Sequence, residues 1–212
     1  MSDSDDDIPK LSKETLAALN EFYAEREREV SEDNEINEDW VRLLIEIGAF
    51  QLSQFWYDET TTEYLTDLVI KAAGPKGKIA LLSCPTVYPV IKSRTTTDET
   101  VYLFEYDERF SKYGDDFIAY DYNKPLNVPK DFSQIFDVVM LDPPFLSEEC
   151  LCKVAETVKF LTSKKIILCT GAVMEELAVN LLNVRKIAFE PKHKNNLANE
   201  FFCYTNFETS NV

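Results

Sequence analysis

Residues 136–145 read Phe-Asp-Val-Val-Met-Leu-Asp-Pro-Pro-Phe, and this stretch decides the fold. Its four consecutive apolar residues, Val-Val-Met-Leu, leave no polar face, which is typical of a strand buried on both sides of a sheet. The strand must end at Asp142, because Pro143 and Pro144 lack the N–H groups that a sheet ladder requires. The Asp142 carboxylate and the carbonyl groups that follow then form a rigid, acceptor-rich corner beside Phe145. Such a corner is suited to hold an uncharged amino group, although a plain strand-terminating turn has the same residues.

Outward from this stretch, short apolar runs alternate with helical patterns. Buried strands are predicted at 78–84, 101–104, 117–120, 136–141 and 165–170, helices at 58–73, 86–92, 147–161 and 173–182, and final β-runs at 185–190 and 200–207. Strands that alternate with helices predict an α/β fold, in which a mainly parallel, doubly wound, Rossmann-like sheet carries helices on both faces. The two last β-runs predict an antiparallel C-terminal pair.

The N-terminal part of the chain is rich in acidic residues. We expect residues 1–39 to form an acidic tail, a helix at 11–30 and an acidic linker, and residues 40–212 to form one globular domain. The formal net charge of −16 and the pI near 4.5 disfavour a nucleic-acid partner, because such a surface repels phosphates. The same charge favours a basic protein surface as partner.

The five cysteines have no metal-ligand spacing, and no metal site is predicted. Their odd number and their apolar surroundings favour free thiols in a reducing compartment. No signal peptide or membrane-length apolar run is visible, so we expect a cytoplasmic protein without a membrane partner. Nothing requires more than a monomer. His193, the only histidine, stands in a lysine-rich polar segment, which favours exposure to solvent over catalysis.

Polar residues follow each of the first four predicted strands: Ser83, Glu105, Asp121 and Asp142. Ligands of doubly wound sheets bind outside the carboxyl ends of the strands, so these residues are expected to line one site. Glu105 follows the second strand, where an acid typically grips the two hydroxyls of an adenosine ribose, with Asp107 as a second contact. A charged residue that leaves the sheet for solvent is the alternative. Asp121 and Tyr122 are candidates for the amino group and the face of an adenine.

Phosphate-binding motifs are absent from the sequence. No Gly-x-Gly-x-x-Gly follows the first strand and no Gly-x-x-x-x-Gly-Lys-Ser/Thr occurs, which disfavours NAD and ATP. S-adenosylmethionine carries no phosphate and remains compatible with the pattern. The adjacent aromatic residues Phe55, Trp56 and Tyr57 cannot share one buried face, so we expect some of them to cover a ligand, with core packing as the alternative.

The Asp-Pro-Pro-Phe sequence at 142–145 resembles the Asp/Asn-Pro-Pro-Tyr/Phe motif of S-adenosylmethionine-dependent amino-methyltransferases. Longer stretches are similar to the eukaryotic protein-lysine methyltransferases that modify elongation factor 1-alpha, formerly labelled N6-adenine methyltransferase-like: 51–57, 104–107, 136–150 and 196–201. The resemblance implies a seven-strand methyltransferase domain within residues 40–212. It also implies transfer of a methyl group from S-adenosylmethionine to a lysine of a basic protein, elongation factor 1-alpha.

The resemblance assigns roles to individual residues. Asp142, Pro143, Pro144 and Phe145 would form the catalytic corner that receives the target amine. The segment 54–57 would lie over the methionine end of the cofactor. The implied cofactor-binding residues are Gln54, Phe55, Trp56, Tyr57, Ser83, Cys84, Glu105, Asp107, Asp121 and Tyr122.

The loop after the first strand departs from the wider fold family, which has glycines there. This chain has Ser83-Cys84-Pro85-Thr86, and Pro85 lacks an N–H and has a fixed φ. Two alternatives therefore stay open beside a protein-lysine methyltransferase. One is an N6-adenine methyltransferase on DNA or RNA, and the other is a non-catalytic binding protein with this fold.

Overall fold

The computed structural model describes residues 56–95, 100–194 and 200–209, and the following concerns these residues alone. Several predictions lie outside them: the acidic tail, the helix at 11–30, the linker, the domain boundary between 39 and 40, and the side chains of Gln54 and Phe55.

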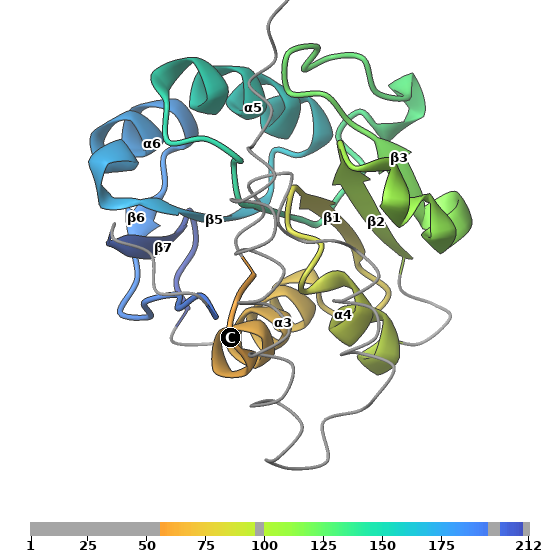
Figure 1. Ribbon diagram of the computed structural model, residues 1–212, viewed down its shortest axis with the longest axis horizontal. Helices are drawn as coiled ribbons and strands as arrows, with labels where there is room; N and C mark the ends of the chain where they lie inside the picture. Colours follow the sequence, from red (N-terminus) through yellow and green to blue (C-terminus); the bar gives the residue numbers. More distant parts are fainter. Residues whose placement is uncertain (1–55, 96–99, 195–199, 210–212) are drawn as a thin grey trace, which may run out of the picture. The chain divides into compact units, whose positions relative to one another are not determined.

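A seven-stranded sheet in the order β3-β2-β1-β4-β5-β7-β6 forms the centre of the domain (Figure 1). The strands are β1 (Lys78–Leu82), β2 (Thr100–Glu105), β3 (Phe117–Ala119), β4 (Val138–Leu141), β5 (Lys165–Gly171), β6 (Arg185–Lys186) and β7 (Phe201–Thr205). The first five run parallel, and β7 pairs antiparallel with both β5 and β6. The predicted parallel sheet with an antiparallel C-terminal pair is confirmed.

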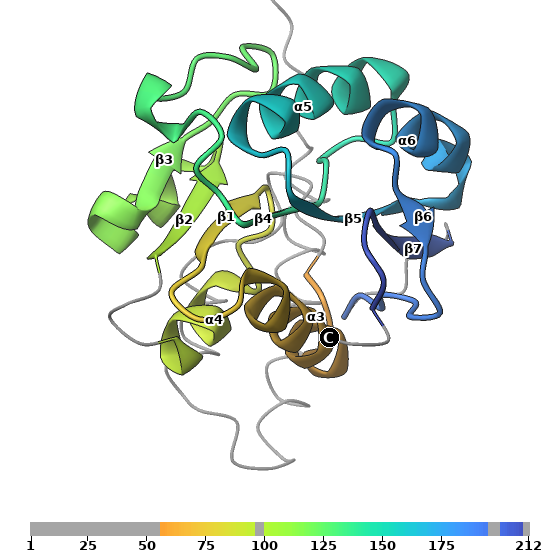
Figure 2. The same ribbon diagram turned by 180° about the vertical axis from the view of Figure 1, so that it is seen from behind.

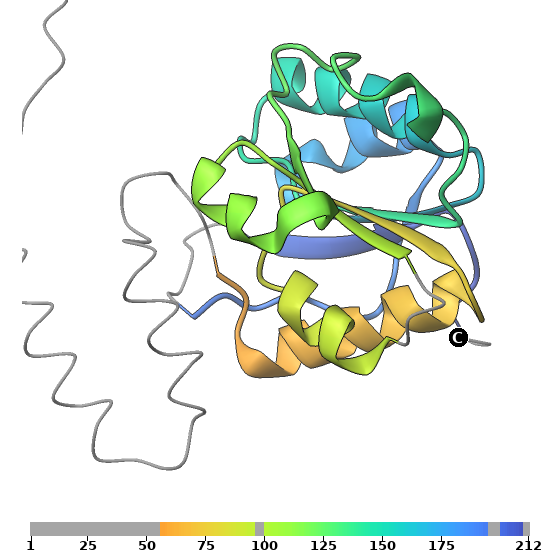
Figure 3. The same ribbon diagram turned by 90° about the vertical axis from the view of Figure 1, so that its right-hand side faces the viewer.

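Helices cover both faces of the sheet. One face carries α3 (Glu59–Ala73) and α4 (Tyr88–Arg94), and the other carries α5 (Glu148–Leu161) and α6 (Glu175–Leu182). Figure 3 shows the two layers edge-on, and Figure 2 shows the same arrangement from behind. The short 3-10 segments are η1 (Glu108–Asp116), η2 (Lys130–Phe132) and η3 (Ala172–Met174).

The sequence sets the ends of these elements locally. All four residues of β4 are fully buried, as a strand covered by helices on both faces requires. The side chain of Asp58 accepts a hydrogen bond from the N–H of Thr61 at 2.7 Å and begins α3. Ser147 begins α5 in the same way, since its hydroxyl accepts the N–H of Cys150 at 3.2 Å. The corner between β4 and α5 is thereby fixed on both sides.

The chain after β6 differs from the predicted strand at 185–190. Only two residues are assigned to β6, and residues 192–194 instead run beside residues 56–58. Tyr57 and His193 form an isolated antiparallel bridge there. A sequence pattern for a strand indicates extended backbone but does not show which segment the strand pairs with. The sequence therefore did not predict that residues 192–194 pair with residues 56–58.

Candidate active site

The carboxyl ends of β2, β1 and β4 meet at one edge of the sheet. Leu82 of β1 is opposite Phe104 on one side and Leu141 on the other, so the next residue of each strand lies at the same level. The N–H of Ser83 donates to the Phe104 carbonyl at 2.9 Å, and the N–H of Asp142 donates to the Leu82 carbonyl at 3.1 Å. Ser83, Glu105 and Asp142 therefore form one row, as expected, whereas Asp121, the fourth residue of the expected set, lies two residues beyond Ala119, the β3 partner of Glu105.

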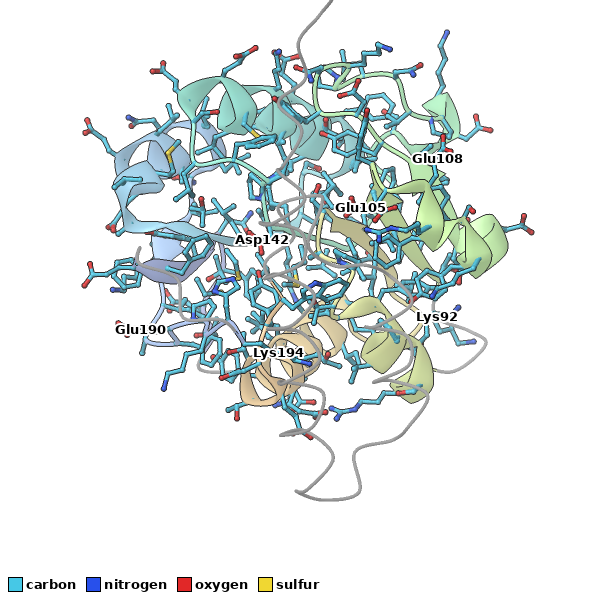
Figure 4. The ribbon with its side chains drawn as sticks, viewed as in Figure 1. Lys92, Glu105, Glu108, Asp142, Glu190 and Lys194 are labelled. Carbon is cyan, nitrogen blue, oxygen red and sulfur yellow. The ribbon has the colours of Figure 1, made fainter. Side chains whose placement is uncertain are left out.

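Glu105 and Asp142 lie close enough to influence each other. Their strands flank β1, so their Cα atoms are about 10 Å apart from the usual strand spacing. The negative charge of Glu105 contributes to the raised pKa of Asp142, after the larger contribution of burial. Figure 4 labels Asp142 near the middle of the view and Glu105 to its right. The two carboxylates thus border a common site.

The Asp142 carboxylate is braced by a tyrosine from a distant part of the chain. The hydroxyl of Tyr57 donates a hydrogen bond to Oδ2 of Asp142 at 2.5 Å. Burial raises the pKa of Asp142 to about 7, the hydrogen bond from Tyr57 opposes the rise, and Glu105 adds to it. Burial and the neighbouring Asp142 carboxylate also raise the pKa of Tyr57, so the tyrosine remains a protonated donor. An aspartate whose pKa is close to neutral pH, next to a fixed hydrogen-bond donor, is typical of a functional site.

The position of Tyr57 depends on the segment that ends at residue 194. The N–H of Asp58 donates to the Lys192 carbonyl, and the N–H of Lys194 donates to the Trp56 carbonyl, both at 2.9 Å. The ring of His193 packs on the ring of Tyr57, with centroids 5.1 Å apart. Tyr57 is only 1% exposed and has little freedom to move.

His193 itself corrects an expectation. It is 8% exposed instead of solvent-exposed, and it also packs edge-on against Phe201 at 4.9 Å. Burial lowers the pKa of His193 to about 4, which the nearby Asp58 only partly opposes, so the ring is neutral at physiological pH. The lysine neighbours in the sequence misled the prediction, because Lys192 and Lys194 point outward from a paired segment while the residue between them points inward.

The ribose candidates are held rigidly at the end of β2. Oε1 of Glu105 accepts hydrogen bonds from the N–H groups of Tyr106 at 2.9 Å and Asp107 at 3.3 Å, which fixes the carboxylate at the strand end. The Asp107 carboxylate accepts the Arg109 Nε at 2.8 Å and forms an ion pair with the same guanidinium. Burial raises the pKa of Asp107, but the hydrogen bonds from Arg109 outweigh it and hold the pKa below its ordinary value. The sequence did not indicate this partner of Asp107.

The adenine candidates lie next to the Asp-Pro-Pro-Phe corner. The ring of Tyr122 is 5.7 Å from the ring of Phe145, and the ammonium of Lys153 lies 5.7 Å from the Tyr122 ring. Asp121 follows β3, and its Oδ1 accepts the N–H of Asn123 at 2.9 Å. Phe145 is 48% exposed, whereas Pro143 is buried. The corner therefore presents an aromatic face at the surface above a buried turn.

The loop after β1 adopts a left-handed backbone conformation at Ser83, a position where related folds have glycine. Ser83 adopts a φ of 54°, the left-handed conformation that glycine reaches without cost. Cys84 is 2% exposed, and its thiol points back to the Met140 carbonyl at 3.6 Å. Burial raises the pKa of this thiol, with Asp142 as the next cause, so Cys84 is a protonated, inert group.

A buried donor at this edge fits a bound ligand. Within the described part of the chain, the indole Nε1 of Trp56 is buried and makes no hydrogen bond. An unsatisfied buried donor costs free energy unless a ligand or water pairs with it. Trp56 also lies 6.5 Å from the ring of Phe110 in η1, beside the end of β2. Glu105 lies at the end of β2, near this indole N–H. The two groups together fit S-adenosylmethionine, whose carboxylate can accept a hydrogen bond and whose ribose has two hydroxyls.

Two features of the described residues bear on other classes of protein. None of their histidine, cysteine, aspartate and glutamate side chains cluster in a way that could hold a metal ion. Within the same ranges, none of the helices is long and apolar enough to cross a membrane. All five cysteines are free thiols.

The sheet and its acceptor corner define the class of protein, a Rossmann-like methyltransferase with an Asp-Pro-Pro-Phe site. Comparison with known proteins agrees. The family model described as probable N6-adenine methyltransferase matches residues 49–209. A structure of a protein from Corynebacterium glutamicum shares the fold with a TM-score of 0.53 at 14% identity, and covers 89% of this chain and 99% of its own.

Curated relatives define the family more narrowly. EEF1A lysine methyltransferase 1 of Mus musculus is 52% identical, over 99% of this chain and 97% of the relative. The Homo sapiens protein of the same name is 48% identical, with 99% and 97% coverage. A protein-lysine N-methyltransferase of Caenorhabditis elegans is 40% identical, with 99% and 98% coverage. The chain belongs to this methyltransferase family, and the resemblance stated from the sequence is confirmed.

Proposed function

We propose that this protein transfers a methyl group from S-adenosylmethionine to the side-chain amine of a lysine in translation elongation factor 1-alpha, the substrate named for its relatives. One observation carries the proposal. The Tyr57-braced carboxylate of Asp142 lies in the same row of strand ends as Glu105, so a nucleoside site and an amine site adjoin.

The cofactor site is assigned to residues around the ends of β1 and β2. When bound, S-adenosylmethionine supplies a methyl group that its sulfonium has already activated. Glu105 would hold the ribose hydroxyls, and Trp56 would donate its indole N–H to the methionine carboxylate. Ser83 would permit close approach of the loop to the cofactor, since its side chain is small and its backbone is in the left-handed conformation at φ 54°. Asp121 and Tyr122 would border the adenine.

The amine site is assigned to the corner after β4. A lysine must be neutral to react, because the ammonium ion has no lone pair. Ionised Asp142 and the Pro143 carbonyl would accept hydrogen bonds from the amine and direct its lone pair toward the methyl group, about 3–3.5 Å away. Phe145 would stabilise the positive charge that develops on nitrogen by about 0.5–2 kcal/mol. The proton released from nitrogen passes to Asp142 or to solvent.

A protein substrate is favoured over a nucleic acid. The Asp-Pro-Pro-Phe corner alone suits the amino group of adenine as well as that of lysine. The net charge of −16 opposes a polynucleotide and attracts a basic protein. We further propose that the enzyme acts as a monomer and that it is located in the cytoplasm; the unpaired thiols of all five cysteines support the location.

Transfer of a radiolabelled methyl group tests the function. Purified protein and labelled S-adenosylmethionine are offered elongation factor 1-alpha, a mixture of other basic proteins, or single-stranded and double-stranded oligonucleotides. We expect label on one lysine of the elongation factor, located by mass spectrometry, and its loss with Asp142→Ala. Label in the oligonucleotides alone would refute the proposal in favour of an adenine methyltransferase. No label in any substrate would favour a non-catalytic protein.

A further inference from the structure

Tyr57 forms a hydrogen bond with Asp142, which a residue that only lines the cofactor site would not require. Its hydroxyl is committed to Oδ2 of Asp142 at 2.5 Å, the length of a strong O–H···O⁻ hydrogen bond. Its ring is fixed by His193 and its backbone by the bridge to the same residue. A side chain fixed in this way can hold the carboxylate in one orientation.

The surroundings of Asp142 make this donor important. The titratable groups that act on this site come from four directions: Glu105 at the end of β2, Cys84 after β1, Cys169 within β5, and Tyr57. Glu105 opposes a second negative charge, and the buried thiols are neutral. Of these groups, the Tyr57 hydroxyl alone favours the ionised form of Asp142.

The second carboxylate oxygen, Oδ1, is the one left to face a substrate. A carboxylate has two oxygens, and Tyr57 occupies Oδ2. The N–H of Asp142 is also used, because it donates to the Leu82 carbonyl and fixes the backbone. With both ends of the residue fixed, Oδ1 has a defined direction.

We propose that Tyr57 is a positioning residue for methyl transfer, which keeps Asp142 ionised and directs its Oδ1 at the substrate amine. The inference rests on the proposed function, since it assumes that an amine binds at this corner. It replaces the role over the methionine end of the cofactor that the family resemblance implied for Tyr57.

The consequence of removing the hydroxyl has a definite sign. A hydrogen bond to the charged form lowers the pKa of a carboxyl group, so Tyr57→Phe raises the pKa of Asp142 above about 7. From the usual strength of such a bond, the rise is about one to two pH units. The variant therefore has too little ionised Asp142 at neutral pH and regains it in alkaline solution.

The experiment compares kcat/KM for Tyr57→Phe and wild type between pH 6.5 and 9. The ratio of the two cancels the titration of the substrate lysine, which is common to both. We expect the wild-type advantage to fall about sevenfold across this range for a rise of one unit and about fortyfold for a rise of two units, because the variant recovers as Asp142 ionises. Binding of S-adenosylmethionine, measured by calorimetry, should change less than about threefold.

Tyr88→Phe is a matched control. Tyr88 is 4% exposed and donates its hydroxyl to a carboxylate oxygen of Asp116 at 2.6 Å, and neither group is among those that shift the pKa of Asp142. The same atom is removed from a similar pair, so its effect on kcat/KM should not depend on pH. A loss in Tyr57→Phe that is equal at all pH values, or a loss of cofactor affinity alone, would overturn the inference.

Thermal unfolding separates this inference from the proposed function. The stability deficit of Tyr57→Phe should grow as the pH rises through 7, because the missing hydrogen bond matters most when Asp142 is ionised. If wild type methylates no protein but this trend appears, the pair stands and the proposed function fails. If wild type is active and both the trend and the pH-dependent ratio are absent, the inference fails and the function stands.

Discussion

Replacing Asp142 with asparagine is expected to stabilise the protein while slowing methyl transfer, because the amide carries no negative charge. The carboxylate is partly buried, accepts the Tyr57 hydroxyl, and has a pKa of about 7 instead of 3.8. Because the folded-state pKa is raised, the stabilising contribution of the protonated carboxyl is complete below about pH 3.8 and is lost as the pH rises through 7. The asparagine side chain keeps an acceptor for the Tyr57 hydroxyl and never ionises, so the variant does not share this loss.

The magnitude follows from the difference between the two pKa values. Each pH unit between them is worth about 1.36 kcal/mol of stability. Between pH 5.5 and 8.5 the wild type therefore loses about 2 kcal/mol that Asp142→Asn retains, most of it below pH 7, and the difference is nearly constant above about pH 8. At about 2–4 °C per kcal/mol for a domain of this size, the advantage of the variant in melting temperature grows by about 4–8 °C.

Melting curves from pH 5.5 to 8.5, above the pI near 4.5, measure this growth. Asp137→Asn is the control, at the opposite end of β4. Asp137 accepts the Lys78 N–H at 2.8 Å and the Lys164 ammonium at 2.7 Å. Burial raises its pKa, but these hydrogen bonds outweigh it and hold the pKa below its ordinary value. The control should be destabilised by an amount that does not vary in this range. A pH-independent difference for Asp142→Asn would refute the reasoning.

Three further substitutions test the structure. Ser83→Gly should raise the free energy of unfolding by up to about 1 kcal/mol in urea titration, because Ser83 is in the left-handed region at φ 54°; a loss of stability would contradict this. Gly171→Ala should lower kcat about tenfold with a small change in melting temperature. The new Cβ would approach Leu146 Cδ1 at 2.9 Å and displace the Asp-Pro-Pro-Phe corner. An unchanged kcat would show that the Leu146 side chain moves aside without displacing this corner. Trp56→Phe should weaken S-adenosylmethionine binding about tenfold, measured by calorimetry, without lowering stability. The indole N–H of Trp56 is buried without a hydrogen-bond partner in the protein, so the substitution removes no internal hydrogen bond. Equal affinity would show that Trp56 is not part of the cofactor site.

The sequence predicts most of the sheet because its signals are local. Alternating apolar runs and helical patterns predict the parallel strands, and the two prolines after Asp142 predict where β4 ends. The row of Ser83, Glu105 and Asp142 follows from these predictions, since parallel strands bring their carboxyl ends to one edge. The structure confirms the row through the register of β1 with its two neighbours.

The rest of the site depends on contacts that no local pattern shows. Tyr57 and Asp142 are 85 residues apart, and an aromatic run predicts burial without naming a partner. The pairing of residues 192–194 with 56–58 has no turn or alternation to announce it, and for this reason His193 was wrongly expected at the surface. The left-handed backbone of Ser83 was missed because serine rarely adopts it.

The bridge between Tyr57 and His193 has a consequence for synthesis on the ribosome. It joins an early segment of the domain to one made more than a hundred residues later, after the strands from β1 to β6 have already emerged. Contacts of such long sequence separation form late and slowly. A nascent chain can therefore assemble much of its sheet while it still lacks the Tyr57–His193 contact that orients Asp142, and the site is complete only after residue 193 has emerged.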